Sequence, residues 1–383
     1  MKTKITKAMV TEYQERLQKA LTDTSGKALA RQISSWYQTY ARDLPWRKRW
    51  SKSRDPYVIW VSEIMLQQTV IKAVLSVYDR FLNRFPRLND LANASEEEVR
   101  QASRGLGYYR RFGLLHKAAK ELTSEIDWQW PETFEEWLAL PGIGTYTAAA
   151  ISSICFDYPS AVVDGNVERV FCRVFAIKEP VGQSWMKKQF KDFGDSIIQA
   201  VNPSDFNQGL MELGQTTCTK SSPSCSVCPI SNLCQAAKLK IQDEVPEIKK
   251  RAQPQEISMR LMIPLNKRGE IGLIKRPDDA RFLKGVWGFP TLIKSDGDLL
   301  LDGNSNRRLK LTNIKERSSI KHTITKYRIK AEVFEWKTTE SDNNIRWVEP
   351  ELLEEQLVAN LDRKALVSWQ KQKHLQKKQP LLF

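Results

Sequence analysis

Apolar residues recur at helical intervals through more than half of the chain. Between Ala28 and about Leu239, apolar side chains follow one another at spacings of three and four residues, and Gly or Pro stands at the joins. The segment from Ile59 to Val74 shows this spacing clearly. The pattern predicts a mainly α-helical domain over residues 28–240.

The pattern changes after this helical stretch. Residues 241–256 carry Pro246, Pro254 and several basic residues, which interrupt every period and predict an exposed linker. Short apolar runs typical of strands follow, joined by turn-rich segments. These runs are Ile257–Pro264, Glu270–Ile274, Ile329–Trp336 and Ile345–Val348, with a turn at Ser295–Asp298. Residues 257–372 are therefore predicted to form an α+β domain with a strand-rich core.

The two ends of the chain carry weaker patterns. Residues 1–27 are polar and mixed in charge, with a short amphipathic set in Val10, Tyr13 and Leu17. We interpret them as an N-terminal extension without an assigned function. Residues 373–383 are interpreted as a basic tail without periodicity.

Composition points to a polyanionic partner. The 383 residues have a formal net charge of +15 and are 41% hydrophobic, so the chain can bury real cores and is not predicted to be disordered. Lys and Arg in such excess favour binding to nucleic acid, although a solvated basic surface has the same composition. The sequence has no apolar signal segment at Met1–Val10 and no run long enough to span a membrane. We therefore expect a soluble, cytoplasmic monomer, associated with the nucleoid if the cell is bacterial.

Four of the six cysteines form a C-x6-C-x2-C-x5-C run. Four thiolates within seventeen residues can surround one metal centre, and both zinc and an iron–sulfur cluster accept four of them. A disulfide pair does not suit a chain of this kind. The other two, Cys155 and Cys172, lie in apolar surroundings and are interpreted as core thiols. The candidate metal ligands are Cys218, Cys225, Cys228 and Cys234.

The segment Leu140–Thr147 reads L-P-G-I-G-T-Y-T, which predicts one helix, a tight glycine hairpin and a second helix. Gly142 and Gly144 permit backbone conformations in which successive amides and a helix N-terminus face one phosphate. A bare G-x-G often only connects two helices. In this context, with Thr147 following, the hairpin predicts a phosphate clamp.

Two carboxylates stand where they could carry chemistry. Asp164 ends an apolar run, and in isolation it is best explained as the cap of the following helix. Glu63 lies among apolar residues on a predicted helix, where burial would raise its pKa and keep a proton available near neutral pH. That suits a general acid, whereas pairing with a neighbouring Arg is the alternative.

Taken in order, these motifs closely resemble the adenine DNA glycosylases of the helix-hairpin-helix endonuclease III superfamily, which remove adenine mispaired with 8-oxoguanine. The resemblance covers roughly residues 28–240. Its segments are L-P-W-R at Leu44–Arg47, S-E-I-M-L-Q-Q-T at Ser62–Thr69, G-L-G-Y-Y at Gly105–Tyr109, the hairpin at Leu140–Thr147, V-D-G-N-V at Val163–Val167 and M-E-L-G at Met211–Gly214, followed by the cysteines.

The resemblance implies a role for each carboxylate. Glu63 would protonate adenine at N7 and later activate the attacking water, and Asp164 would stabilise the sugar cation, with Asn166 positioning groups nearby. The chemistry independently requires such a pair, because cleavage of an N-glycosidic bond makes an oxocarbenium-like sugar. The resemblance also implies a [4Fe–4S] cluster in the loop 218–234.

The target base must leave the helix, and something must fill the gap. The resemblance nominates Gln68 and Tyr108 as wedges. Double-stranded DNA with A:8-oxoguanine or A:G mispairs is the predicted partner. The residues predicted to contact it are Arg47, Gln68, Tyr108, Gly142, Gly144, Thr147 and Thr325.

Tyr146 separates two related activities. Bifunctional relatives of the endonuclease III type place a Lys at this hairpin position, and its amine forms a Schiff base with the sugar before strand cleavage. A phenol cannot form that imine, so we predict base removal without an efficient lyase step, with Tyr146 assisting at the sugar. The alternatives are a bifunctional glycosylase and AP lyase, and a catalytically silent iron–sulfur protein that binds DNA.

The second domain resembles the Nudix-like module of the same family, most visibly at Gly285–Pro290. It lacks the G-x5-E-x7-R-E-x2-E-E metal box, which argues against pyrophosphate hydrolysis and favours a role in recognition. The family reads 8-oxoguanine with a Phe-Ser-His loop after an earlier histidine. Here His322 is followed by Ile324-Thr325-Lys326, so the stacking and imidazole groups are lost while a hydroxyl remains. Discrimination against guanine is therefore predicted to be weaker.

The spacer Lys48–Arg54 is longer than is usual in the family. Its basic groups could touch the DNA backbone, but a solvated loop is the preferred interpretation.

Overall fold

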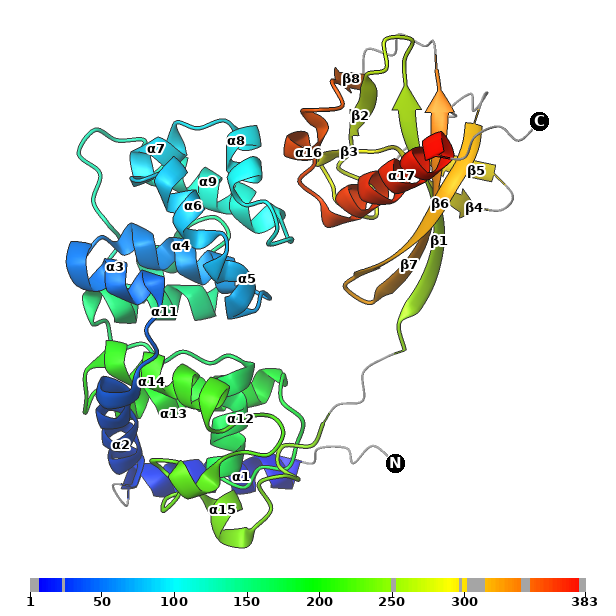
Figure 1. The fold of residues 1–383 in the computed structure, drawn as a ribbon. Coiled ribbons are helices and arrows are strands. Elements are labelled where there is room, and N and C mark those ends of the chain that lie inside the picture. The colour runs from blue at the N-terminus through cyan, green and yellow to red at the C-terminus, as the bar shows by residue number, and fades with distance from the viewer. Residues whose placement is uncertain are drawn as a thin grey trace. The chain divides into compact units, whose positions relative to one another are not determined.

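The computed structural model describes residues 7–22, 25–248, 253–295, 298–301, 314–338 and 345–378. The chain separates into two compact units (Figure 1). The first contains the chain up to Ala94 together with Gly113–Lys250, and the second contains Ser95–Phe112 and the chain from Arg251 onward. No helix among the described residues is long and apolar enough to cross a membrane.

The first unit is helical in its described residues, as the sequence predicted for this part of the chain. The helix α9 begins within the segment assigned to the second unit and continues into the first. In chain order the helices are α1 (Lys7–Thr22), α2 (Ser25–Tyr40), α3 (Pro45–Ser53), α4 (Pro56–Leu66), α5 (Ile71–Leu75), α6 (Tyr78–Arg84), α7 (Leu88–Ala92), α9 (Arg110–Leu122), α10 (Phe134–Ala139), α11 (Thr145–Phe156), α12 (Gly165–Val174), α13 (Ser184–Ile198), α14 (Pro203–Thr216), the 3₁₀ turn η1 (Cys225–Val227) and α15 (Gln235–Leu239).

Helix α4 lies in the core of this unit. Its residues Pro56–Met65 are all buried, as expected for a helix that is apolar on every side. The helix starts cleanly because Pro56 occupies its first turn and the side chain of Asp55 accepts a hydrogen bond from the Tyr57 amide at 3.0 Å. Any charged group on α4 is therefore removed from water.

Helix α14 packs against α2, α11 and α12. Two of its glycines make the close approaches possible. A Cβ at Gly209 would lie 2.9 Å from side-chain atoms of Ile33 and Tyr37 on α2, and a Cβ at Gly214 would lie 2.8 Å from the Cβ of Asn166 on α12. The glycine of the M-E-L-G motif is thus required by helix packing.

Two segments outside the predicted helical pattern are also helical. The spacer Lys48–Arg54 was expected to be a solvated loop, but most of it belongs to α3, which the Pro45 ring starts and buried Trp46 anchors. That interpretation was wrong because the proline and the buried tryptophan precede the basic run. The N-terminal extension contains α1, whose Tyr13 and Leu17 are buried.

The second unit is built on a mixed sheet that has eight strands in the described residues. Strands β3, β2, β1, β4 and β5 follow one another, β7 pairs with β1 and β6, and β8 pairs with β2. The long β1–β7 pairing is parallel and runs from Gln255 opposite Tyr327 to Leu265 opposite Lys337. The strands are β1 (Gln255–Leu265), β2 (Ile271–Lys275), β3 (Trp287–Gly288), β4 (Thr291–Ser295), β5 (Asp298–Leu301), β6 (Ile314–Ile324), β7 (Tyr327–Lys337) and β8 (Ile345–Val348).

The four strands predicted from apolar runs correspond to β1, β2, β7 and β8. Strand β6 was missed because its residues are mostly polar and exposed or half-buried. The predicted turn at Ser295–Asp298 includes residues 296 and 297, which lie outside the described residues.

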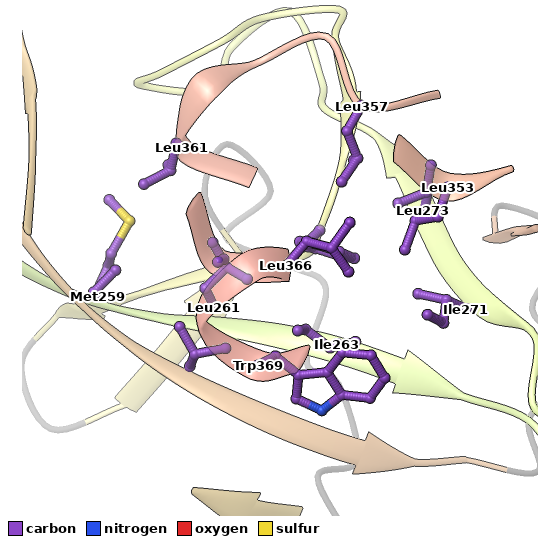
Figure 2. Packing of buried hydrophobic residues seen from close by; sticks show 14 of the residues in the cluster. Met259, Leu261, Ile263, Ile271, Leu273, Leu353, Leu357, Leu361, Leu366 and Trp369 are labelled. Atoms are coloured by element: carbon purple, nitrogen blue, oxygen red, sulfur yellow. The ribbon is translucent and has the colours of Figure 1, made fainter. Parts of the chain in front are cut away.

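One face of the sheet is covered by α17 (Asn360–Lys378), with α16 (Leu353–Gln356) before it (Figure 1). Figure 2 shows Leu361, Leu366 and Trp369 packed over the buried β1 side chains Met259 and Leu261. Helix α17 extends to Lys378, so residues 373–378, predicted as a tail without periodicity, continue this helix. The remainder of that tail lies outside the described residues.

A buried ion pair holds α17 to the end of β2. The Arg276 guanidinium donates to both carboxylate oxygens of Asp362, at 2.7 and 3.1 Å, and both residues are at most 2% exposed. Phe289 completes the arrangement, because its amide donates to Asp362 and its carbonyl accepts from Arg276. A Cβ at Gly288 would lie 2.4 Å from Arg276 Nη1, so this glycine of the G-V-W-G-F-P motif makes room for the pair.

The segment Ser95–Phe112 contains α8 (Glu96–Ala102) and belongs to this second unit. Arg104 Nη1 donates to the Glu354 carbonyl and the Tyr109 hydroxyl donates to the Val358 carbonyl, each at 2.8 Å. The Tyr109 ring also packs against a small cluster of buried apolar side chains that includes Val358. These contacts tie the G-L-G-Y-Y segment to the sheet domain.

Candidate active site

Glu63 is a buried carboxyl group on α4. It is 5% exposed, and within the described residues its Oε2 atom has no hydrogen-bond partner. Burial raises the pKa of Glu63 from its ordinary 4.5 to about 7, and the charge of Asp164 adds to the rise. A hydrogen bond from Tyr146 and the charge of Arg47 act in the opposite direction. Glu63 can therefore carry a proton near neutral pH.

Tyr146 stands at the start of α11, directly after the glycine hairpin. Its hydroxyl hydrogen-bonds Glu63 and lies 3.0 Å from the sulfur of Met211 on α14. Burial raises the pKa of this phenol well above its ordinary value, and the charges of Glu63 and Asp164 raise it further. Tyr146 therefore stays a neutral phenol within electrostatic reach of both carboxyl groups.

Asp164 is both a helix cap and a member of this group. Its Oδ1 accepts hydrogen bonds from the amides of Asn166 and Val167 at 2.9 and 2.8 Å, and its Oδ2 accepts from the Asn166 side chain at 2.8 Å. The cap interpretation and a role in the site are therefore compatible. The three donors hold the half-buried carboxylate in one orientation at the positive end of α12.

Asn166 is held in turn by Arg169. The Arg169 guanidinium donates to Asn166 Oδ1 at 3.1 Å, to the Gly214 carbonyl at 2.5 Å and to the Cys218 carbonyl at 2.9 Å. One side chain therefore connects α12, the end of α14 and the first cysteine. Sequence reasoning gave Arg169 no role, because its partners are far away along the chain.

A second buried carboxylate, Glu212, was also missed. It is 1% exposed and pairs with Arg42 and, at 3.0 Å, with Arg47. Arg47 also donates to Gln208 at 3.1 Å and to the Arg42 carbonyl at 3.0 Å. Although burial opposes ionisation, the hydrogen bond from Arg42 and the charge of Arg47 lower the pKa of Glu212.

The Arg47 guanidinium, predicted to contact DNA, is thus committed to partners inside the protein and lies near Glu63. Two features of the sequence could have revealed this network. One is Glu212, which stands alone in the apolar M-E-L-G segment, and the other is the pair Arg42 and Arg47 on either side of L-P-W.

The glycine hairpin has the predicted form. Helix α10 is capped by Thr133, and α11 begins after Gly144, which leaves the first amides of α11 available at a helix N-terminus. Gly142 has φ +79°, and a Cβ there would lie 2.6 Å from the Leu114 Cβ, so only glycine fits. Thr147 differs from the prediction, because it is 3% exposed and its hydroxyl accepts a hydrogen bond from Gln67 at 3.3 Å.

The two predicted wedge residues share an unusual backbone conformation. Gln68 has φ 54° and Tyr108 has φ 49°, a region that side-chain-bearing residues rarely adopt. Both side chains are exposed, Tyr108 to 48%. Such strain in exposed residues is typical of functional positions.

The predicted recognition loop is the turn of the β6–β7 hairpin. Thr325 stands in this turn with φ 52°, which is a rare conformation for a β-branched residue, and its side chain is exposed. His322 pairs with buried Ile329 and is half-buried on the α17 side of the sheet, away from the turn. Burial and the nearby Lys364 lower its pKa. At this end of the hairpin the turn residues Thr325 and Lys326 are exposed, together with Thr323 and Arg328 on the strands beside them.

The four candidate metal ligands lie around one pocket. All are half-buried free thiols, and the pocket is lined by them together with side chains such as Val170, Arg173 and Ile230. Burial and the neighbouring thiols raise the pKa of Cys228 to about 12. Arg173 lines the same pocket, and its Nη1 donates to Cys218 Sγ at 3.2 Å. Within the described residues, no three candidate ligands converge as a single-ion site.

Comparison with known proteins agrees with this geometry. The family model for the HhH-GPD superfamily of base excision DNA repair proteins matches residues 61–193, and that for the NUDIX domain matches residues 260–368. The adenine DNA glycosylase of Rattus norvegicus is 45% identical over 214 residues, which are 55% of this chain and 42% of that protein. The adenine DNA glycosylase of Buchnera aphidicola subsp. Baizongia pistaciae is 32% identical over 292 residues, covering 74% of this chain and 79% of that protein.

The chain belongs to the adenine DNA glycosylase family. Among solved structures, a thermostable thymine-DNA glycosylase aligns with a TM-score of 0.50 and 28% identity, covering 57% of this chain and 99% of that one. The predicted fold class, a helix-hairpin-helix glycosylase domain followed by a Nudix-like domain, is thereby confirmed. This member of the family spans less than half the length of the mammalian relatives that it matches.

The burial of Glu63 predicts a pH-dependent effect on stability. Because its pKa is about 7 in the folded protein and near 4.5 when exposed, the folded state retains a proton that the unfolded state has released between these values. The contribution of Glu63 to stability therefore falls as pH rises through this window. Glu63→Gln should be more stable than the parent by an amount that grows over the window to about 3 kcal/mol.

Urea unfolding at pH 4.5, 6 and 8 measures this difference. Glu121→Gln, at an exposed position on α9, is the matched control and should show no such trend. A Glu63→Gln difference that does not change with pH would mean that the pKa of Glu63 is the same in the folded and unfolded states.

Proposed function

We propose that this protein is a base-excision repair enzyme that removes adenine mispaired with 8-oxoguanine or guanine in double-stranded DNA. The observation that carries the proposal is the pairing of two unlike carboxyl groups. Glu63 is buried and holds a proton near neutral pH, whereas Asp164 is fixed by three N–H donors. Hydrolysis of an N-glycosidic bond needs one of each.

The reaction follows from these two environments. Glu63 donates its proton to N7 of the extruded adenine, which makes the base a neutral leaving group. The Asp164 carboxylate stabilises the positive charge that develops on the sugar, and its orientation is already set before the base leaves. Glu63, now ionised, accepts a proton from water as the water attacks the sugar. Its pKa near 7 suits both steps.

Tyr146 and Asn166 support the two carboxylates. Tyr146 is hydrogen-bonded to Glu63, and Asn166 donates to Asp164 at 2.8 Å. The hairpin position of Tyr146 offers no amine, so base removal should leave the strand uncut. This argues against a bifunctional glycosylase and AP lyase, and the intact carboxyl pair argues against a silent DNA-binding protein.

Arg47 is proposed to act within the protein. Because its donors engage Gln208, Glu212 and the Arg42 carbonyl, it is better suited to hold the wall of the site and to moderate the pKa of Glu63 than to bind a phosphate. Thr147 is also proposed to act within the protein, where its hydroxyl accepts a hydrogen bond from Gln67 and holds that side chain in place.

DNA contacts are proposed at exposed positions. The amides of Gly142 and Gly144 and the N-terminus of α11 bind a backbone phosphate. Gln68 and Tyr108 enter the duplex where the adenine has left, and their strained backbones hold the side chains outward. Thr325, at the tip of the β6–β7 hairpin, contacts the opposite base.

The four cysteines are proposed to hold a [4Fe–4S] cluster. Their thiol chemistry fits, because soft thiolates are the usual ligands and Arg173 supplies a hydrogen bond to one of them. When bound, the cluster would fix the loop 218–234 beside α12, and no step of the reaction passes through it.

Single-turnover kinetics test the proposed reaction. The parent should release adenine opposite 8-oxoguanine with strands uncut until alkali is added, and borohydride should trap no covalent complex. Glu63→Gln should lower the rate by at least about a hundredfold because the acid is lost. Above pH 7 the parent rate should fall, since Glu63 becomes ionised. Trapped complex or nicked strands would instead indicate a lyase.

The mispair preference tests the recognition turn. Because Ile324-Thr325-Lys326 retains a hydroxyl but lacks an aromatic ring and an imidazole, the excision rates on A:8-oxoguanine and A:G should differ less than in a relative with the Phe-Ser-His loop. Restoring Phe-Ser-His at 324–326 should widen the ratio. An unchanged ratio of the two excision rates would mean that residues outside 324–326 distinguish 8-oxoguanine from guanine.

Chemical analysis of the purified protein distinguishes an iron–sulfur cluster from a zinc ion at the four cysteines. The purified chain should contain about four iron and four sulfide per molecule and little zinc. Cys225→Ser should lose the iron, whereas Cys155→Ser should retain it, because Cys155 lies on α11 outside the pocket. Zinc in place of iron would contradict the cluster.

A further inference from the structure

The N-terminal helix α1 is integrated into the first unit. Its Tyr13 and Leu17 are 6% and 5% exposed. The Tyr13 ring stacks on Trp185 of α13, with ring centroids 6.1 Å apart and planes inclined by 6°. A helix that was merely appended would not bury its aromatic side chain in this way.

Arg16 joins α1 to the end of α12. Its Nη1 donates to the Phe175 carbonyl at 3.0 Å, and Phe175 is the C-cap residue that follows Val174, the last residue of α12. The last carbonyls of a helix lack partners and form the negative end of its dipole, so a guanidinium is well placed there. The opposite end of the same helix is capped by Asp164.

Tyr13 supplies a second connection. Its hydroxyl hydrogen-bonds the carboxylate of Glu179, in the segment between α12 and α13. Glu179 is 7% exposed, and its other oxygen has no hydrogen-bond partner in the described part of the chain. A buried carboxylate that lost its donor would be costly. The buried carboxylate of Glu179, in the segment after α12, therefore depends on the Tyr13 hydroxyl of α1 for its hydrogen bond.

We propose that α1 is a positioning element of the active site, in which Tyr13 and Arg16 hold the C-terminal end of α12 and thereby fix Asp164 at its N-terminal end. The helix between them has ten residues, or about 15 Å, and moves as one body. This inference rests on the proposed function, in which Asp164 stabilises the sugar cation. Neither residue touches the reacting atoms.

Two full-length variants remove one connection each. Arg16→Met keeps the aliphatic stem but loses the donor to Phe175, and Tyr13→Phe keeps the ring on Trp185 but leaves Glu179 without its donor. Arg16→Lys retains a donor and should restore parent behaviour. Glu15→Gln, on an exposed position of α1, is the control.

Two measurements separate positioning from general stability. The first is amide hydrogen exchange at the start of α12, where the Val167 amide donates to Asp164, compared with the amides of α4. The second is the single-turnover rate of adenine release at saturating enzyme, with the dissociation constant for mispaired DNA. Arg16→Met and Tyr13→Phe should speed exchange at the start of α12 alone, and should slow release roughly three- to tenfold without weakening binding.

Exchange at Val167 that is unchanged in both variants would overturn the inference, whatever the rates. Faster exchange with an unaltered release rate would also overturn it, because α1 would then be structural only. A parent that releases no adenine would refute the proposed function. In that case faster exchange would still support the hold of α1 on Asp164, and unchanged exchange would still overturn it.

Discussion

The dry environment of α4 is the constraint on which the site depends. A carboxyl group in water would be ionised near neutral pH, and the exclusion of solvent around Glu63 is the main reason that it keeps its proton. That exclusion is built from large apolar groups. Trp60, one turn before Glu63, packs edge-on against Trp137 of α10 with centroids 5.3 Å apart, and both rings are fully buried. The raised pKa of Glu63 is thus a property of the packing around it.

Helix α14 contacts the candidate site in two places, at Tyr146 and at Asn166. It carries Met211 beside the Tyr146 hydroxyl, Glu212 beneath two arginines, and Gly214 against Asn166. These contacts of three of its four residues explain the M-E-L-G motif in physical terms. Glu212 pairs with Arg42 and Arg47, and the positive charge of Arg47 is thereby held near Glu63. The burial of Glu212 is tolerable because both of its oxygens are paired.

The sequence predicted the parts of the molecule that are encoded locally. The helices of the first unit, four strands of the second, the hairpin around Gly142 and the burial of Glu63 all follow from short-range patterns of apolar residues and glycine. Asp164 in isolation was best explained as a cap, and the resemblance gave it a catalytic role; the structure shows the cap and places the same carboxylate within electrostatic reach of Glu63.

What the sequence did not predict depends on partners distant in the chain. Glu212 meets Arg42 across 170 positions, and Arg169 meets Cys218 across 49, so neither pair leaves a local pattern. Strand β6 was missed because it borders the sheet with polar residues. Helix α3 was missed because its basic residues obscured the initiating Pro45 and the anchoring Trp46.

The contact at Gly214 has a mechanical consequence. Where two helices meet through side chains, rotamer changes can absorb small shifts, but here the backbone of α14 lies directly against Asn166. Neither helix can slide without displacing the other, and Arg169 donates to the Gly214 carbonyl across the same junction. The junction of α12 and α14 is therefore a rigid point in the first unit, and Asp164, which accepts a hydrogen bond from the Asn166 side chain, is held at it.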